Sequence, residues 1–178
     1  MVLGVGLKMR VYSLNATDPK QIKSAYLAVA PIVKNTKIFD SDSPKDALLA
    51  NQVAAGVVWN GEVCAANRKY PDIKYIYPRE GFALWIDSLC IPKSAPNLAE
   101  AYALINYLLR PEVSATISSE LGYATPYAAA RELLGPEIQK NPMVYPPTQD
   151  FARGEKVIDV GAAIATYEKY WMLLRAKK

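Results

Sequence analysis

Histidine is absent from the 178 residues of the chain, and cysteine occurs only twice, as Cys64 and Cys90. Histidine is the commonest general base and the commonest metal ligand, so its absence argues against most hydrolytic and metal-dependent sites. Both cysteines lie among apolar residues, which favours buried free thiols and leaves the question of their pairing open. We therefore expect a protein that binds rather than an enzyme, with no metal and no cofactor.

Long apolar runs, strong charge and nucleotide-binding motifs are missing too. No run is long enough to span a membrane, and the net charge of +4 comes from scattered residues, which argues against nucleic-acid binding. Gly4-Val5-Gly6 lacks the third glycine of a dinucleotide site, and neither a phosphate loop nor a nucleophile elbow occurs. Residues 1–8 have no basic leader or clear cleavage site, so we do not expect a signal peptide there. Either an export signal lies outside this chain, or the protein stays inside the cell.

The stretch 82–91 is almost entirely apolar and lies between Gly81 and Pro92, which predicts a strand covered on both faces. Asp87 is the exception, because an ionised carboxylate in such a run is costly unless a cation meets it. Trp85 lies two residues earlier, on the same side of the strand. An aromatic face beside a carboxylate suits an alkylammonium ligand. In the alternative interpretation, Trp85 packs in the hydrophobic core and Asp87 accepts hydrogen bonds from nearby backbone groups. These residues alone do not favour one interpretation over the other.

Strands and helices are expected to alternate in the first half, which predicts an α/β layer with much parallel pairing. The expected strands are 37–39, 53–59 and 73–77, and the expected helices are 19–33, 46–51 and 62–69. Asp18 and Pro19 are a typical helix start. Trp59 stands at the carboxyl end of an expected strand, where ligands sit in open α/β sheets. Its alternative role is a hydrophobic plug over the sheet.

After Pro92 the pattern becomes helical, with expected helices at 97–109, 111–121, 128–134 and 161–176. Asn97 and Glu100 resemble a capping box, and Gly122 is expected to end the second of these helices. The loop after it presents Tyr123, whereas Trp171 is expected in the core. In the first half, the polar turn 40–44 could bind a cation, but helix capping explains its composition equally well and is favoured.

Six motifs occur together in a characteristic order and spacing. They are Ser41–Asp42, Val58–Gly61, Leu84–Ser88, Ile105–Pro111, Gly122–Pro126 and Asp159–Ala162. In combination they closely resemble the spermidine/putrescine-binding proteins of bacterial ABC transporters. The resemblance covers essentially the whole chain, but only the carboxy-terminal half of that family.

The resemblance implies type II periplasmic-binding-protein-like lobes, each of α/β class, that close on ligand about a hinge. It assigns residues 1–85 to the second lobe, 86–130 to the first, and 131–178 to the second again. It also implies that Trp59 and Trp85 are walls along the ligand's methylenes and that Asp87 accepts from an ammonium. Tyr123 and Ser41 are implied as lesser polar contacts. A glutamine contact of the family falls at Val157, which loses that hydrogen bond.

The resemblance further implies a periplasmic polyamine carrier that meets a membrane permease. Because the chain corresponds to half of the family, we expect it to self-associate and, by itself, to bind polyamine weakly or not at all. Two alternatives remain open. One is a ligand-sensing regulatory domain of the same architecture, and the other is a degenerate module that no longer binds polyamine, which the loss at Val157 would favour. Which polyamine is bound also remains open.

Overall fold

The computed structural model describes residues 2–176, which divide into two compact units. Unit 1 contains the described residues up to 39, residues 76–86, and those from 148 onward. Unit 2 contains residues 40–75 and 87–147. The predicted assignment to lobes used other boundaries, and it stays a prediction because it refers to lobes that this chain covers only in part.

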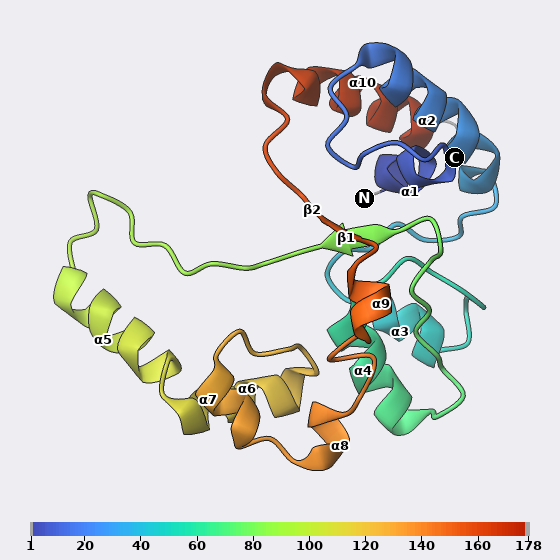
Figure 1. Ribbon diagram of the computed structural model, residues 1–178. Helices are drawn as coiled ribbons and strands as arrows, with labels where there is room; N and C mark the ends of the chain where they lie inside the picture. Colours follow the sequence, from blue (N-terminus) through green and yellow to red (C-terminus); the bar gives the residue numbers. More distant parts are fainter. Residues whose placement is uncertain (1, 177–178) are drawn as a thin grey trace. The chain divides into compact units, whose positions relative to one another are not determined.

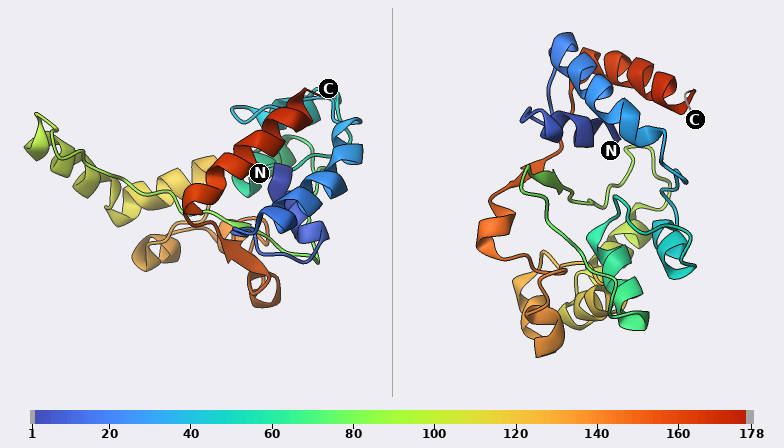
Figure 2. Two further views of the ribbon diagram at one scale, coloured as in Figure 1. Left: turned by 90° about the horizontal axis from the view of Figure 1, so that it is seen from above. Right: turned by 90° about the vertical axis from the view of Figure 1, so that its right-hand side faces the viewer.

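Unit 1 is built on three helices that pack together, α1 (Val2–Met9), α2 (Pro19–Val33) and α10 (Ile164–Arg175) (Figure 1). Figure 2 shows α10 running beside α2 in both views. The start of α2 is as expected, with Pro19 in its first turn and the Asp18 carboxylate accepting from the N–H of Lys20 at 2.8 Å. The core between the helices contains Leu3, Tyr26, Val29, Val33 and Leu174.

Trp171 of α10 packs against this core as expected. Its ring meets the ring of Phe39 edge to face, with centroids 5.3 Å apart. Tyr170, the preceding residue, stacks on Tyr26 at 4.9 Å. The 3-10 turn η1 (Gly161–Ala163) leads into α10, so the predicted helix 161–176 is largely confirmed.

Unit 1 also holds a two-stranded parallel sheet of β1 (Phe82–Leu84) and β2 (Gly154–Lys156). Phe82 pairs with Gly154 and Leu84 with Lys156. The short helix α9 (Thr148–Phe151) precedes β2. The prediction of a covered strand over 82–91 is therefore wrong beyond Leu84, because the partner strand ends there and residues 85–90 are exposed.

The strands predicted at 37–39, 53–59 and 73–77 are also absent from the described chain, where these runs are irregular. A short apolar run is compatible with a strand, but it becomes one only when a neighbour supplies its hydrogen bonds. Among the residues described, the strand content of this chain is confined to β1 and β2.

Unit 2 is helical. Its helices are α3 (Pro44–Leu49), α4 (Asn60–Lys69), α5 (Leu98–Leu108), α6 (Pro111–Leu121), α7 (Ala128–Glu132) and α8 (Pro136–Gln139). Its core contains Cys64, Ala115, Ala130, Leu134, Ile138 and Val144. Gly122 ends α6 in the left-handed conformation with φ of 75°, as expected from the sequence.

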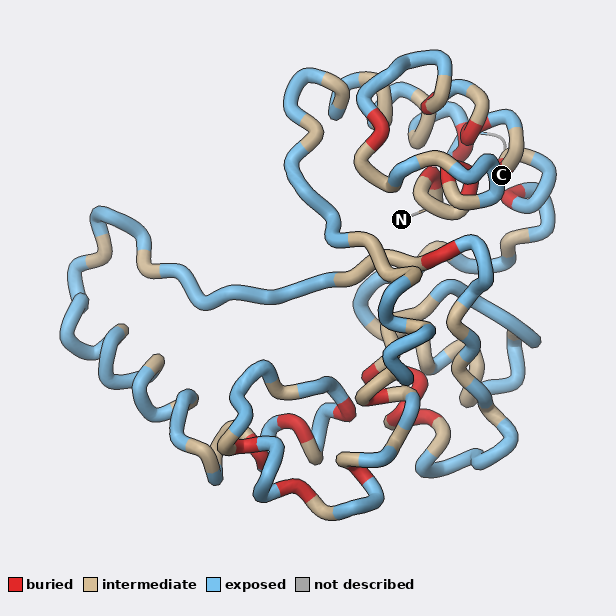
Figure 3. The backbone as a smooth tube through the Cα atoms, in the orientation of Figure 1, coloured by how far each residue is buried: buried red, intermediate tan, exposed pale blue. Residues whose placement is uncertain are grey.

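Helix α5 differs from the expectation. It begins after Asn97, but the Asn97 side chain forms no capping hydrogen bond, and none of the helix residues is buried (Figure 3). Its exposed large apolar residues are Leu98, Tyr102, Leu104 and Tyr107, followed by Leu109 just after the helix. These large apolar residues are thus solvent-facing among the described residues.

The two cysteines are both free, as favoured by the sequence. Cys64 is buried in α4, which confirms the prediction for this residue. Cys90 is exposed, so the prediction of a buried thiol is wrong there, because the stretch that carries it has no covering layer. Within residues 2–176, no helix has the length and apolar character needed to cross a bilayer.

Candidate functional site

Four of the five predicted ligand contacts lie in unit 2, and Trp85 lies in unit 1. Trp59 is half-buried immediately before α4, and its carbonyl accepts from the N–H of Val63 at 3.2 Å. Asp87 is exposed in the segment that follows β1. Tyr123 is on the loop that follows α6, at the threshold between exposed and half-buried, with 36% of its surface accessible.

The start of α4 and the loop after α6 are interlocked through two glycines. A Cβ added to Gly61 would lie 2.4 Å from a ring carbon of Tyr123, so the ring lies directly against this glycine. A Cβ added to Gly122 would lie 2.8 Å from Cβ of Cys64. The motifs that carry Trp59 and Tyr123 are therefore brought together by close packing of their glycines.

The Tyr123 hydroxyl lies in a negative electrostatic environment. Burial raises the pKa of Tyr123, the charges of Glu62 and Asp87 raise it further, and a hydrogen bond with the backbone of Glu62 acts in the opposite direction. Burial first, and then the two carboxylates close enough to influence it, favour the neutral phenol. A positive ligand group at this position would be attracted by the same field.

Glu62 is a residue of this environment that the sequence interpretation missed. Its carboxylate forms an ion pair with Lys45 at 2.7 Å, and that hydrogen bond is the main cause that raises the pKa of Lys45. Its position in the first turn of a helix, three residues after Trp59, is a signal that could have identified it. The ion pair with Lys45 engages the Glu62 carboxylate within unit 2.

The loop that presents Tyr123 is held at several points. The buried Ser118 hydroxyl donates to the carbonyl of Tyr123 at 2.5 Å. The hydroxyls of Thr125 and Ser114 are 2.9 Å apart, and the N–H of Thr125 donates to the Tyr145 oxygen at 3.3 Å. These hydrogen bonds hold the loop in one conformation. Less conformational entropy would therefore be lost when Tyr123 contacts a ligand.

Ser41 is exposed on the polar turn 40–43. One carboxylate oxygen of Asp40 accepts from the N–H groups of Asp42 and Ser43, at 2.8 and 3.2 Å. These bonds agree with a turn-stabilising role for the acidic residues. Among residues 2–176, no group of three acidic, cysteine or histidine side chains could hold a metal ion. The role of Ser41 as a ligand contact stays a prediction.

In unit 1, Trp85 lines a shallow hollow of about 130 Å³. The other lining residues are Leu84, Ile86, Lys156 and Val157. Trp85 is 57% exposed, so it is not the core residue that its alternative interpretation requires. Val157, where the resemblance implies that a glutamine contact is lost, therefore lies beside the predicted aromatic wall.

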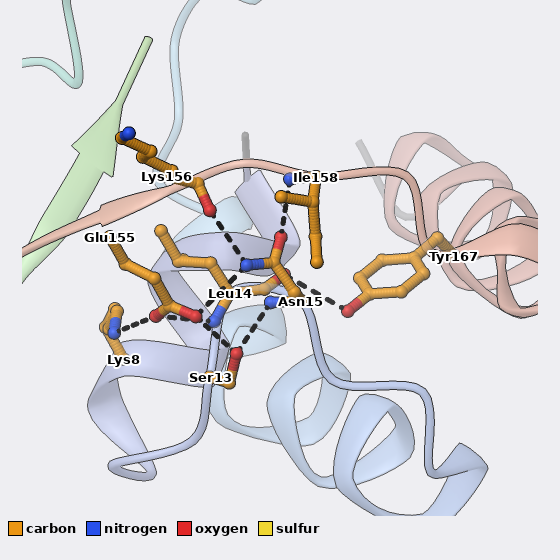
Figure 4. A network of polar contacts seen from close by, with 8 residues as sticks. All are labelled: Lys8, Ser13, Leu14, Asn15, Glu155, Lys156, Ile158 and Tyr167. Carbon is orange, nitrogen blue, oxygen red and sulfur yellow. Dashed lines mark hydrogen bonds and ion pairs between the residues drawn. The ribbon is translucent and has the colours of Figure 1, made fainter.

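A network of polar contacts centred on Glu155 of β2 supports this part of unit 1 (Figure 4). The Glu155 carboxylate accepts from Lys8 Nζ at 2.5 Å, from the N–H of Leu14 at 3.0 Å, and from the hydroxyl of Ser13. Burial alone would raise the pKa of Glu155, but the hydrogen bonds from Lys8, Ser13 and Leu14 outweigh it and lower the pKa to about 2. Glu155 is therefore ionised throughout the physiological range and joins β2 to α1 and the loop after it.

Glu155→Gln is expected to lower the free energy of unfolding of unit 1 by about 1–3 kcal/mol at pH 7. The ordinary pKa of 4.5 is lowered in the folded protein to about 2, so the stabilisation is complete above about pH 4.5. It is lost as the pH falls through about 2, where the difference between variant and wild type should vanish. Urea unfolding at several pH values measures this. Glu168→Gln, on the exposed face of α10, is the matched control and should change little. A constant difference at all pH values would contradict the assignment.

Gly61→Ala tests the interlock in unit 2. The added methyl group must displace the Tyr123 ring, and overpacking of this kind typically costs about 1–3 kcal/mol. Thermal unfolding should show the loss. Gly56→Ala is the control, because a Cβ at the exposed Gly56 would meet only a side-chain carbon of Val58, at 3.3 Å. Equal stability of the two variants would show that the ring moves without cost.

Comparison with known proteins gives one consistent result. Residues 5–146 match the family model described as bacterial extracellular solute-binding protein. The spermidine/putrescine-binding periplasmic protein of Salmonella typhimurium is 40% identical over 175 residues, which is 98% of this chain and 50% of that protein. The chain thus spans about half the length of the curated relatives it matches.

Solved structures agree with this result. A spermidine/putrescine ABC transporter protein from Listeria monocytogenes superimposes with a TM-score of 0.92 at 31% identity, over 99% of this chain and 55% of that one. The substrate-binding protein PotD of Streptococcus pneumoniae gives 0.79 at 31% identity, again over 99% of this chain and 55% of that one. The resemblance found in the sequence is thereby confirmed. The chain belongs to the bacterial extracellular solute-binding proteins, with the α/β fold of their PotD-type members.

Proposed function

We propose that this chain is part of a periplasmic polyamine-binding protein that delivers spermidine or putrescine to a membrane ABC permease. In this proposal Asp87 accepts hydrogen bonds from a ligand ammonium, Trp59 and Trp85 contact its methylenes, and Tyr123 and Ser41 add polar contacts. The relatives named above are described as spermidine/putrescine-binding or transporting proteins, which supports this ligand class.

The observation that carries the proposal is the negative environment of the Tyr123 hydroxyl. Two carboxylates, Glu62 and Asp87, act on it, and Asp87 is exposed to solvent. A polyamine presents ammonium groups separated by methylenes, so it needs carboxylate acceptors together with apolar or aromatic walls. The chain supplies both kinds of group, and it has no histidine for a competing catalytic role.

The test is calorimetric titration of the chain joined to the half of its relatives that it does not span. Putrescine and spermidine should bind with one site per molecule, and higher salt should weaken binding because an ion pair contributes. The diol 1,4-butanediol, which has the methylenes of putrescine without its charges, is the control ligand and should not bind. Failure of both polyamines to bind would overturn the proposal and favour a degenerate or regulatory module.

We also propose that the chain by itself self-associates through α5. Several exposed apolar side chains on one helix favour association, and Leu104 and Leu109 are both more than half exposed. Sedimentation equilibrium should show association that Leu104→Lys reduces. Leu27→Lys, at an equally exposed leucine of α2, is the control and should leave the association unchanged. A wild-type chain that remains monomeric at high concentration would contradict this proposal.

A further inference from the structure

The backbone just after β2 forms hydrogen bonds on both of its edges. In an extended strand, the N–H and C=O of one residue point to one edge, and those of its neighbours point to the other. The N–H of Val157 donates to the carbonyl of Leu84, 3.4 Å away on β1. The carbonyl of Lys156 and the N–H of Ile158 therefore point away from β1.

Asn15 occupies this outer edge (Figure 4). Its Nδ2 donates to the carbonyl of Lys156 at 2.8 Å, and its Oδ1 accepts from the N–H of Ile158 at 3.0 Å. One side-chain amide thus forms the pair of bonds that the backbone of a third strand would form. The outer edge of β2 is thereby covered, as exposed strand edges commonly are in native proteins.

Asn15 is itself held in one orientation. Its N–H donates to the Ser13 hydroxyl at 3.0 Å, and its Nδ2 lies 3.2 Å from a carboxylate oxygen of Glu155. The Tyr167 hydroxyl of α10 donates to the carbonyl of Ala16 at 2.8 Å, which anchors the same loop. With acceptors on the Nδ2 side and a donor on the Oδ1 side, the reverse orientation of the amide is excluded.

We call the two hydrogen bonds from the Asn15 side chain to the backbone of Lys156 and Ile158 the Asn15 clamp. This clamp affects the hollow in unit 1. Leu84 pairs with Lys156, so Trp85 and Val157 follow next on the two strands and line the same hollow. Val157 is the residue between the two that Asn15 binds. Fixing its neighbours fixes the direction of its side chain, because side chains alternate along an extended backbone.

We propose that Asn15 is a positioning residue that holds Val157 beside Trp85 and so shapes an apolar wall for the aliphatic part of a bound polyamine. The ligand in this statement rests on the proposed function, whereas the clamp does not. The valine side chain offers no hydrogen bond, so the wall contacts methylenes rather than a nitrogen. Asn15 touches no ligand in this proposal and acts through Val157 and Trp85.

The first experiment measures the clamp without any ligand, by amide hydrogen exchange of Asn15→Leu. Loss of both bonds should speed exchange at Ile158, and at Val157 beside it, by about tenfold. Asn67→Leu is the matched control, because Asn67 also donates to two backbone carbonyls, those of Pro71 and Ile73, but in unit 2. It should leave exchange at both positions unchanged. Asn15→Ser, which adds no apolar volume, replaces the leucine variant if that variant does not fold.

The second experiment measures spermidine affinity of the chain joined to the remaining half of its relatives. Asn15→Leu should raise the dissociation constant about fivefold to tenfold. In a Trp85→Ala background the same substitution should raise it less than about twofold, since the wall has already been removed. Asn67→Leu should not change affinity in either background.

Unchanged exchange at Val157 and Ile158 would overturn the clamp. Faster exchange with wild-type affinity, or an affinity loss of equal size with and without Trp85, would overturn the positioning role in binding. If the wild type binds no polyamine, the proposed function fails and the ligand part of this inference fails with it, while the exchange measurement still decides the clamp.

Discussion

Asp87→Asn is expected to weaken spermidine binding by about 2–5 kcal/mol, which corresponds to an increase of the dissociation constant of about 30-fold to several thousandfold. The asparagine keeps the shape of the side chain but removes its charge, so a desolvated ammonium loses its ionic partner. Calorimetry on the chain joined to the remaining half of its relatives measures the loss.

The control for this prediction is Asp72→Asn, which removes the charge of another exposed aspartate of unit 2. It should change affinity by less than about twofold, because exposed charges away from a site act only through screened, long-range attraction. Equal effects of the two substitutions would show that Asp87 contributes only to the general field. Unchanged affinity of Asp87→Asn would remove Asp87 from the site.

Trp171→Ala is expected mainly to lower stability, whereas Trp85→Ala is expected mainly to weaken binding. Trp171 packs on the core of unit 1 and on Phe39, so its truncation should cost about 3 kcal/mol of the free energy of unfolding. Trp85 is mostly exposed, so its truncation should cost less than about 1 kcal/mol of stability.

The same two variants should rank in the reverse order in binding. Trp85→Ala should weaken spermidine affinity by about 1–3 kcal/mol through the loss of an aromatic contact. Trp171→Ala should leave affinity unchanged at temperatures where the protein stays folded. Urea unfolding and ligand titration of both variants separate the two quantities. A large stability loss at Trp85 with wild-type affinity would identify it as a structural residue.

The helices of this chain could largely be predicted from local signals. Asp18 and Pro19 start α2, Pro111 starts α6, and Gly122 ends it in the left-handed conformation, because each of these residues acts within its own turn. The strands could not be predicted in the same way. A strand depends on a distant partner, and the partner of β1 is β2, a segment rich in charge and glycine that carries no strand signal.

The candidate residues of the site could be proposed from the sequence, whereas the contacts that hold them could not. Trp85 and Asp87 stand out in an apolar run, whereas Asn15 and Glu155 look like ordinary polar residues of the sequence. Their roles depend on contacts across about 140 positions of sequence, which only the folded chain brings together. Glu62 is an intermediate case. Its position three residues after Trp59 could have marked it as a candidate, but its effect on Tyr123 is visible only in the structure.

The two free cysteines have a practical consequence. Cys64 is enclosed in the core of unit 2 next to Gly122, whereas Cys90 is exposed in the segment that follows Asp87. A thiol-reactive dye added to the native chain should therefore attach at Cys90 alone. This chain thus carries a single addressable attachment point, three residues after the proposed ammonium acceptor, without any engineering. A fluorophore there would report ligand arrival optically, and the slow appearance of a second label at Cys64 would time the spontaneous opening of unit 2.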